Sequence, residues 1–337
     1  MAQTLVISSP GLDSNNADAG RLKMFLTQFG GEVMTAYRRF SVTLGRHMER
    51  TISNGKAADF PVLGRKIANY LTPGKSLDDL RKAEQQTQVS IKIDGLLTAD
   101  TLITDIDEAM NHYDVRSEYS YQIGEALAMA RDGGLLAEIA KGVVADKELL
   151  PGLGKGKILK RTVENGLTTE SEALGKAIVS MLLEAKTAMS NNYVPNEGRV
   201  CYMLPVCVNA LVASKDAINR DFGAVASIVD AKVTRIAGID IVECPHLTIG
   251  GVTSTDNGTP EGLIQGTGHI FPAEYKAAFL VAHRTTVGTL VLKSFNLEHG
   301  RRIEYQADHI VGKYAMGHGC LRPEAAFMGV IETAPGA

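Results

Sequence analysis

Residues 88–93 read Gln-Val-Ser-Ile-Lys-Ile, and apolar and polar residues alternate one by one along this stretch. Strict alternation is typical of a β-strand with one covered and one exposed face. The expected partner strand runs from Phe60 towards Tyr70, and the segment between the two strands is dense in turn formers and charged residues. The pattern predicts a long β-hairpin over residues 59–94 with a charged tip.

A two-stranded ribbon on its own is only marginally stable in water. The predicted hairpin is therefore expected to lie against something else, either the rest of its own domain or a neighbouring subunit.

The amino-terminal region is expected to be a loose tail followed by a short helix. Residues 1–20 are mainly polar and turn-forming. After them Leu22, Phe25, Leu26 and Phe29 recur at helical spacing until Gly30-Gly31, where glycines of this kind commonly end a helix.

A long amphipathic helix is predicted from about Ser117 to about Lys141, although Gly133-Gly134 should weaken or bend it by about 1 kcal/mol each. Its apolar residues follow at steps of four and three, and its acidic residues recur every seven positions: Ile123, Leu127 and Ala130, and Glu118, Glu125 and Asp132.

A second helix is expected after Thr169 and Glu172, which form a capping-box pattern. The apolar residues that follow are spaced four, three, four and four apart: Leu174, Ile178, Met181, Ala185 and Met189. Beyond this helix, short apolar runs such as 200–204 and 278–282 alternate with turn-rich stretches, which predicts an α+β fold.

Composition restricts the class of protein. The 337 residues are 45% hydrophobic and 22% charged, as in globular proteins. With 38 acidic and 35 basic residues, the net charge of −3 leaves no broad cationic surface for nucleic acid.

No apolar run approaches the ~18 residues of a membrane span, and the first basic residue is Arg21, so neither a membrane segment nor a secretory signal is expected. Four scattered cysteines indicate reduced core thiols in a cytoplasmic setting: Cys201, Cys207, Cys244 and Cys320.

Candidate chemistry is weak, and we expect neither a cofactor nor enzymatic activity. Residues 152–157 resemble a phosphate loop, but Ile158 stands where such a loop needs Ser or Thr, so a flexible linker at a domain boundary is expected. In Cys244-Pro245-His246 the proline fixes a turn between thiol and imidazole, which argues against catalysis.

The densest group of possible metal ligands is Asp308, His309, His318 and Cys320. Their spacing matches no ordinary zinc template, so turn histidines and a core thiol are the simpler interpretation. A metal-dependent hydrolase that uses Asp308, His309 and His318 is kept as an alternative from a different class.

Five stretches carry a resemblance to a known family. They are Phe29-Gly30-Gly31-Glu32-Val33, FPVLGR at 60–65, PGKSLDD at 73–79, IDGLLTADTLITDIDEAMNHYDVRSEY at 93–119 and YAMGHGCLRPEAA at 314–326. They are similar to the major capsid proteins of T-seven-like short-tailed phages, over most of residues 21–145 and 281–330.

The resemblance implies the Hong Kong ninety-seven-type capsid fold. Its parts would be an amino-terminal arm at 1–58, an extended loop at 59–94, a peripheral domain with a spine helix at 95–151 and 286–321, and an axial domain at 152–285 and 322–337.

It also implies a function as a major capsid protein that forms pentamers and hexamers of an icosahedral shell around the DNA genome. Expected partners are further copies of the chain, a scaffolding protein and a portal, with no sequence-specific DNA binding. The expected location is the virion, after assembly in the bacterial host cytoplasm. An encapsulin-like cellular compartment shell shares this fold and is the alternative in the same class.

If the hairpin and the arm reach adjacent subunits, the hairpin's tip charges would set the register of the contact more than its affinity. These charges are Lys75, Asp78, Asp79, Arg81 and Lys82. Each exposed pair there is expected to contribute less than about 1 kcal/mol.

Overall fold

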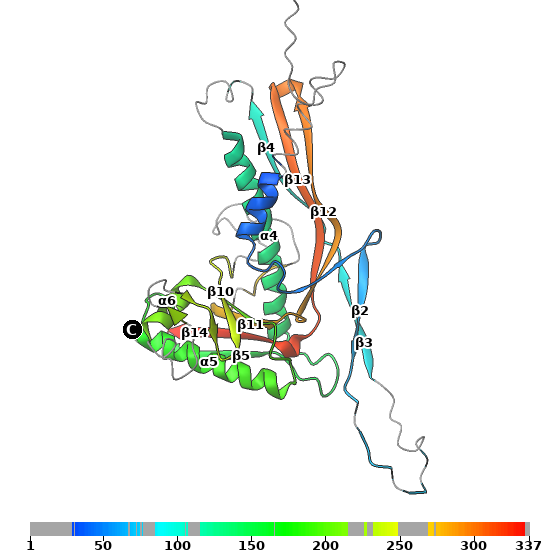
Figure 1. Cartoon of the computed structure of the whole chain (residues 1–337), viewed down its shortest axis with the longest axis vertical. Helices are drawn as coiled ribbons and strands as arrows, with labels where there is room; N and C mark the ends of the chain where they lie inside the picture. Colours follow the sequence, from blue (N-terminus) through cyan, green and yellow to red (C-terminus); the bar gives the residue numbers. More distant parts are fainter. Residues whose placement is uncertain are drawn as a thin grey trace, which may run out of the picture. The chain divides into compact units, whose positions relative to one another are not determined.

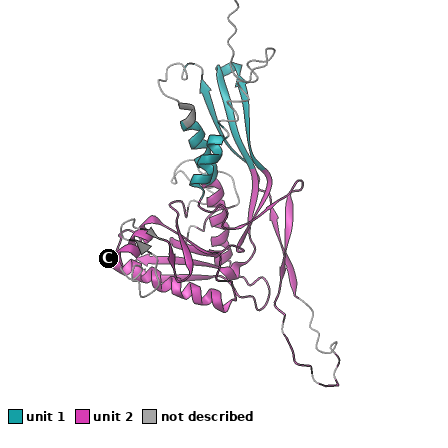
Figure 2. Cartoon of the chain, in the orientation of Figure 1, with its two compact units in different colours: residues 1–41, 96–128, 294–314 teal, residues 42–95, 129–293, 315–337 magenta. Residues whose placement is uncertain are grey.

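The structure is a computed structural model that describes residues 29, 31–66, 68–71, 73–74, 76, 85–104, 106, 115–164, 166–214, 226–227, 232–248, 269–272 and 274–333. The chain divides into two compact units (Figure 2). Unit 1 contains residues 1–41, 96–128 and 294–314, and unit 2 contains residues 42–95, 129–293 and 315–337.

A six-stranded sheet with the order β5-β14-β11-β6-β10-β9 is the main sheet of unit 2 (Figure 1). Two of its neighbouring pairs, β5 with β14 and β6 with β10, are parallel, and the other three are antiparallel. The strands are β5 (Lys157–Val163), β6 (Arg199–Met203), β9 (Arg235–Ile236), β10 (Ile239–Glu243), β11 (Ala277–His283) and β14 (Ala326–Thr333).

Helices cover both faces of this sheet. In β6, Cys201 and Met203 pack in the cluster that contains α5 (Glu172–Asn191) and α6 (Pro205–Ala213). Val200 and Tyr202, between them, pack in a second cluster with residues 135–143 of a long helix, α4. A strand buried on both faces reads as a continuous apolar run, which is why 200–204 and 278–282 lack alternation.

The structure confirms the helix expected after Thr169 but corrects its cap. All five periodic apolar residues of α5, from Leu174 to Met189, are buried. The residue that caps the helix is Ser171, whose hydroxyl oxygen accepts a hydrogen bond from the amide N–H of Leu174 at 3.2 Å. Thr169 lies two residues too early for this role, because the cap must face the first free amides of the helix.

The long helix is confirmed as α4 (Val115–Val144), which at 1.5 Å per residue measures about 45 Å. It contributes residues 115–128 to unit 1 and 129–144 to unit 2. The glycines 133 and 134 do not interrupt it. The three acidic residues at seven-residue spacing do not share one exposed face, because Asp132 is fully buried, where its carboxylate binds the segment that follows residue 41.

A second sheet has the order β1-β12-β13-β4, and unit 1 contains the hairpin end of its strands β12 and β13. The strands are β1 (Met48–Thr51), β4 (Gly95–Thr104), β12 (Val287–Arg302) and β13 (Ala307–Cys320). The β12–β13 turn is the 3₁₀ segment η2 (Ile303–Tyr305), followed by Gln306 in the left-handed region at φ 46°. A second 3₁₀ segment, η3 (Pro323–Ala325), precedes β14.

The expected helix end at Gly30-Gly31 is wrong. Residue 29 is helical, and so are residues 31–40, with Gly31 included. Val33, Ala36 and Tyr37 are buried and continue the apolar spacing from Phe29. Burial of this continuing apolar face outweighs the weak helix propensity of a glycine.

The predicted hairpin is confirmed as an antiparallel ribbon of β2 (Ala57–Leu63) and β3 (Gln86–Lys92), paired from Ala57 with Lys92 to Leu63 with Gln86. The first strand lies earlier than expected. Described residues 65–70 form no strand and are exposed, so no covered face there favours alternation. Two short strands, β7 (Ala226–Ser227) and β8 (Lys232–Val233), pair antiparallel.

Candidate functional site

The ribbon of β2 and β3 is the candidate functional site, because one part of it is buried and another part is exposed and apolar. Ile91 of β3 is 1% exposed and packs with Leu290 and Leu321. Val62 of β2 packs with Leu150. We call this packed part, residues 57–62 and 89–94, the ribbon root.

Two glycines of β13 make room for the ribbon root. A Cβ on Gly317 would lie 1.9 Å from the carbonyl oxygen of Lys92, and a Cβ on Gly319 would lie 2.8 Å from Cγ1 of Ile91. A Cβ atom does not approach non-bonded atoms this closely in real proteins. These glycines belong to the Gly317-His318-Gly319-Cys320 stretch considered above for metal binding, and their shared role here is close approach of the ribbon.

A buried histidine joins the ribbon root to α4. His269 Nε2 lies 2.6 Å from Asp94 Oδ2, and His269 Nδ1 lies 2.7 Å from Glu138 Oε1. Lys141 Nζ donates to the same Glu138 oxygen at 2.9 Å. With a carboxylate at each ring nitrogen, both nitrogens carry a proton, so the ring is an imidazolium that bridges strand and helix.

The surroundings explain the charge states of this cluster. Burial disfavours the charged ring of His269, but the hydrogen bonds to Asp94 and Glu138 outweigh burial and raise its pKa to about 9. Burial opposes ionisation of Glu138, but hydrogen bonds from His269 and Lys141 lower its pKa overall. His318 is different, because burial and the nearby His269 charge lower its pKa well below the ordinary value, and its Nδ1 lies 2.9 Å from Thr289 Oγ1.

A second buried cluster fixes the segment that leads into β1. The Asp132 carboxylate accepts hydrogen bonds from the amide of Val42 at 2.6 Å and the hydroxyl of Thr43 at 2.5 Å. Arg131 forms an ion pair with Glu49. Burial and the neighbouring Arg131 lower the pKa of His47, so this ring is favoured in its neutral form. Sequence reasoning missed both clusters, because their partners are far apart in the chain.

The predicted contact residues Lys75, Asp78, Asp79, Arg81 and Lys82 all lie outside the described residues. Their role therefore stays a prediction.

Described residues next to the predicted tip are exposed and apolar. The exposed fraction is 65% for Leu63, 100% for Tyr70 and 49% for Leu71. Three large exposed apolar side chains within nine residues of the chain make this segment a candidate for a protein interaction site.

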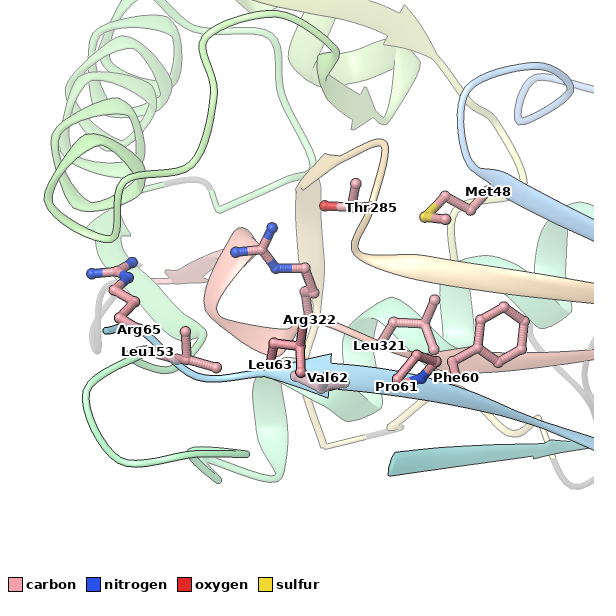
Figure 3. A pocket seen from close by; sticks show the side chains of 10 residues that line it. All are labelled: Met48, Phe60, Pro61, Val62, Leu63, Arg65, Leu153, Thr285, Leu321 and Arg322. Carbon is pink, nitrogen blue, oxygen red and sulfur yellow. The ribbon is translucent and has the colours of Figure 1, made fainter. Parts of the chain in front are cut away.

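A groove of about 530 Å³ lies beside β2, and we call it the root groove (Figure 3). Side chains of β2 line one side, and Met48 and Thr285 line the opposite side. Its ten lining residues are Met48, Phe60, Pro61, Val62, Leu63, Arg65, Leu153, Thr285, Leu321 and Arg322. The groove is mainly apolar and contains two guanidinium groups.

The possible metal ligands have protein partners of their own. His309 Nε2 lies 2.9 Å from Asp100 Oδ2, and Asp308 forms an ion pair with Arg301 at 3.2 Å. Burial raises the pKa of the Cys320 thiol to about 12. Within the described ranges, no group of three or more His, Cys, Asp or Glu side chains is arranged to hold a metal ion.

The other two candidate motifs, Cys244-Pro245-His246 and the loop at 152–157, also have structural roles. Burial raises the pKa of Cys244 to about 12, which makes it a poor nucleophile. The loop at 152–157 is fixed rather than a flexible linker, because Glu148 accepts hydrogen bonds from the amides of Gly152 at 2.8 Å and Gly154 at 2.9 Å, and Leu153 is buried. A side-chain carboxylate thus occupies the position that a phosphate would need. The domain boundary expected there stays a prediction.

Comparison with known proteins identifies the family. The profile of the Gp10A-like major capsid protein family matches residues 59–330. The major capsid protein of Escherichia phage T7 is 46% identical over 323 residues, which cover 92% of each chain. The chain belongs to this capsid protein family.

Solved structures agree with the assignment. A chain from the capsid structure of the cyanophage P-SCSP1u is 32% identical, with a TM-score of 0.70 over 97% of this chain and 100% of that chain. A chain from the mature capsid of bacteriophage PhiM1 has a TM-score of 0.69 at 17% identity, over 88% of each chain. The fold is therefore the expected α+β capsid fold of the Hong Kong ninety-seven type.

The assignment confirms a function as a major capsid protein of a tailed phage. Its relatives are structural proteins of the virion and not enzymes, and capsid shells imply assembly of many subunits. The compartment shell and the hydrolase are not favoured. Among the described helices, none is both long enough and apolar enough to span a bilayer.

Proposed function

We propose that the chain builds the pentamers and hexamers of an icosahedral shell, and that the extended loop at 59–94 and the arm at 1–58 contact adjacent copies. The observation that carries this proposal is the exposure of Leu63, Tyr70 and Leu71, at the end of β2 and in the segment that leads from it to the predicted tip. The ribbon root is packed within the subunit, and the large apolar side chains left exposed beyond it are typical of a protein interaction surface.

A shell also fits the energetics of repeated weak contacts. A contact of about 4 kcal/mol corresponds to a dissociation constant near 1 mM, which is too weak to hold a pair of free subunits. Each subunit of a shell holds several neighbours at once, so the effective concentration makes the whole assembly durable. We infer that the charges Lys75, Asp78, Asp79, Arg81 and Lys82 set the register of these contacts.

The parts of the proposed subunit are the arm, the extended loop, a peripheral domain at 95–151 and 286–321, and an axial domain at 152–285 and 322–337. The 30 residues of α4 support a spine for the peripheral domain. The sheet covered by α5 and α6 supports a separate core for the axial domain.

We further propose assembly in the bacterial host cytoplasm with a scaffolding protein and a portal, around DNA that is enclosed without sequence-specific binding. The net charge of −3 supports the last point, because a slightly acidic subunit does not adhere strongly to a polyanion.

The test is deletion of residues 74–82. We expect the variant subunit to fold, with an unchanged unfolding transition, but the yield of shells in sedimentation and negative-stain microscopy to fall at least tenfold. A control replaces the same nine residues with a Gly/Ser segment of equal length. It distinguishes the effect of a shorter loop from the effect of losing the side chains of residues 74–82. Shells of unchanged yield and thermal stability from the deletion variant would remove the proposal.

A further inference from the structure

We propose that the root groove receives the ribbon tip of a neighbouring copy, with Leu77 and Leu80 in its apolar part and the carboxylates of Asp78 and Asp79 facing its guanidinium groups. This inference rests on the proposed assembly and deepens it, because it names the receiving surface on the neighbour.

The apolar part of the groove is already built in the single subunit. Val62, Leu153 and Leu321 are each less than a tenth exposed, and their side chains line the groove together with the exposed Leu63. At about 530 Å³ the space lies within the range of pockets that bury a drug-sized ligand. The β2 side chains face Met48 and Thr285 across it (Figure 3).

Two arginines give the groove its charge. Arg65 donates a hydrogen bond to the carbonyl oxygen of Asn192 and lies 4.6 Å from the ring centroid of Tyr193. Arg322 Nε donates to Glu324 Oε1 at 2.7 Å, and its guanidinium projects into the space between β2 and Thr285 (Figure 3). Both are held in place by these contacts, and a held guanidinium is well suited to bind a carboxylate.

No acidic residue is among the ten that line the groove, although Glu324, outside the lining, already pairs with Arg322. A complementary occupant therefore carries apolar side chains together with carboxylates. The tip sequence Leu77-Asp78-Asp79-Leu80 has this composition, since two leucines enclose two aspartates. Charge complementarity of this kind selects partner and register.

Chain length allows the contact. Residues 64–85 lie beyond the last paired residues of β2 and β3. At about 3.3 Å per extended residue, the middle of this segment reaches up to roughly 35 Å from the paired part of the ribbon, which is about the width of a small domain. A tip with this reach is long enough to span the width of a small domain and contact an adjacent copy.

The test is disulfide cross-linking inside assembled shells. The full chain carries Leu63→Cys at the groove together with Leu80→Cys at the tip, and copper phenanthroline serves as the oxidant. We expect a ladder of dimers and higher multimers in non-reducing denaturing electrophoresis, which collapses to one band after reduction. Cys201, Cys207 and Cys244 are buried and should interfere little, and the parental chain, which keeps the partly buried Cys320, gives the background of native cross-links.

The matched control combines Leu80→Cys with Leu183→Cys, which is 49% exposed on α5 and lies outside the groove lining. This pair is expected to give a ladder at least tenfold weaker. Intact shells that give no ladder with Leu63→Cys, an equal ladder with the control, or only an intrachain disulfide in a monomer band would each overturn the inference while the assembly proposal stands. Failure of the unmodified chain to form shells would overturn both.

A charge exchange supplies a second readout. Arg65→Glu and Asp78→Arg are each expected to lower the yield of shells at least fivefold, because each places like charges opposite one another. The double variant is expected to recover at least half of the parental yield. A double variant no better than the worse single variant would contradict the pairing of the tip carboxylates with the groove.

Discussion

The main sheet of unit 2 and the ribbon differ in where their apolar surface is buried. Strands β6 and β11 are buried along their whole length between two layers of helix. The ribbon buries only its root and leaves Leu63 exposed, and Tyr70 in the segment that follows β2 is also exposed. The sheet is therefore stabilised within one subunit, and the ribbon has apolar surface left for contacts between subunits. Variants in the two regions should affect different measurements.

The largest effect on the subunit is expected for Phe279→Ala in β11. Phe279 is fully buried, and its ring lies against Gly329 of β14, where a Cβ would be 2.3 Å from a ring carbon. Loss of the ring should lower the free energy of unfolding by about 3–5 kcal/mol. Denaturant unfolding of unassembled subunits measures this. Leu183→Ala on α5 is the exposed control, and an equal loss in both variants would contradict a core role for Phe279.

A pH effect of on the order of 2–3 kcal/mol is expected from His269. Its pKa is about 9 in the folded chain and near 6.5 when unfolded. Its contribution to stability is therefore complete below about pH 6.5 and is lost as the pH rises towards 9. Stability measured across this range should fall, and His269→Gln should flatten the curve. His309→Gln in unit 1 is the control, and the same flattening there would reject the assignment.

A smaller loss, about 1–3 kcal/mol, is expected for Gly317→Ala, because the new Cβ collides with the Lys92 carbonyl and displaces the ribbon root. The displacement should reduce the yield of shells more than the stability of the subunit. Gly300→Ala is a matched control on the paired strand β12, since a Cβ there meets no atom within 4 Å. Equal behaviour of the two variants in unfolding and sedimentation assays would show that the glycine is not needed for close approach.

The smallest effect on the subunit is expected for Leu63→Ser combined with Tyr70→Ser. Both side chains are exposed, so the free energy of unfolding should change by no more than about 0.5 kcal/mol. Shells made from this variant should dissociate at a clearly lower denaturant concentration than parental shells. If their midpoint is unchanged, the exposed apolar residues of the ribbon do not stabilise the assembly.

The periodic spacing of apolar residues predicted the elements that bury one face against a single adjacent layer. The spacing of Leu174, Ile178 and Met181 predicted α5, and the alternation at 88–93 predicted β3. Asp132 and Gly31 were misinterpreted for a common reason. An acidic residue on a helix or a glycine in an apolar run has an ordinary local meaning, and here contacts with distant segments override it.

The site itself was only partly predictable. The ribbon followed from local alternation, but the triad of Asp94, Glu138 and His269 joins residues separated by up to 175 positions. No spacing rule connects them. The sequence does contain two glycines, Gly317 and Gly319, on either side of a histidine. They indicate a close backbone approach only when the position of the ribbon root against β13 is known.

The buried thiols have a consequence for the durability of the protein outside a cell. Cys207 and Cys244 have a pKa of about 12, raised by burial, so at pH 7 only about one thiol in 100,000 is ionised. Oxidation by air proceeds through the ionised sulfur. Long storage in aerated water should therefore leave Cys207 and Cys244 unmodified, and thiol-labelling reagents should react little with these two side chains in the folded subunit.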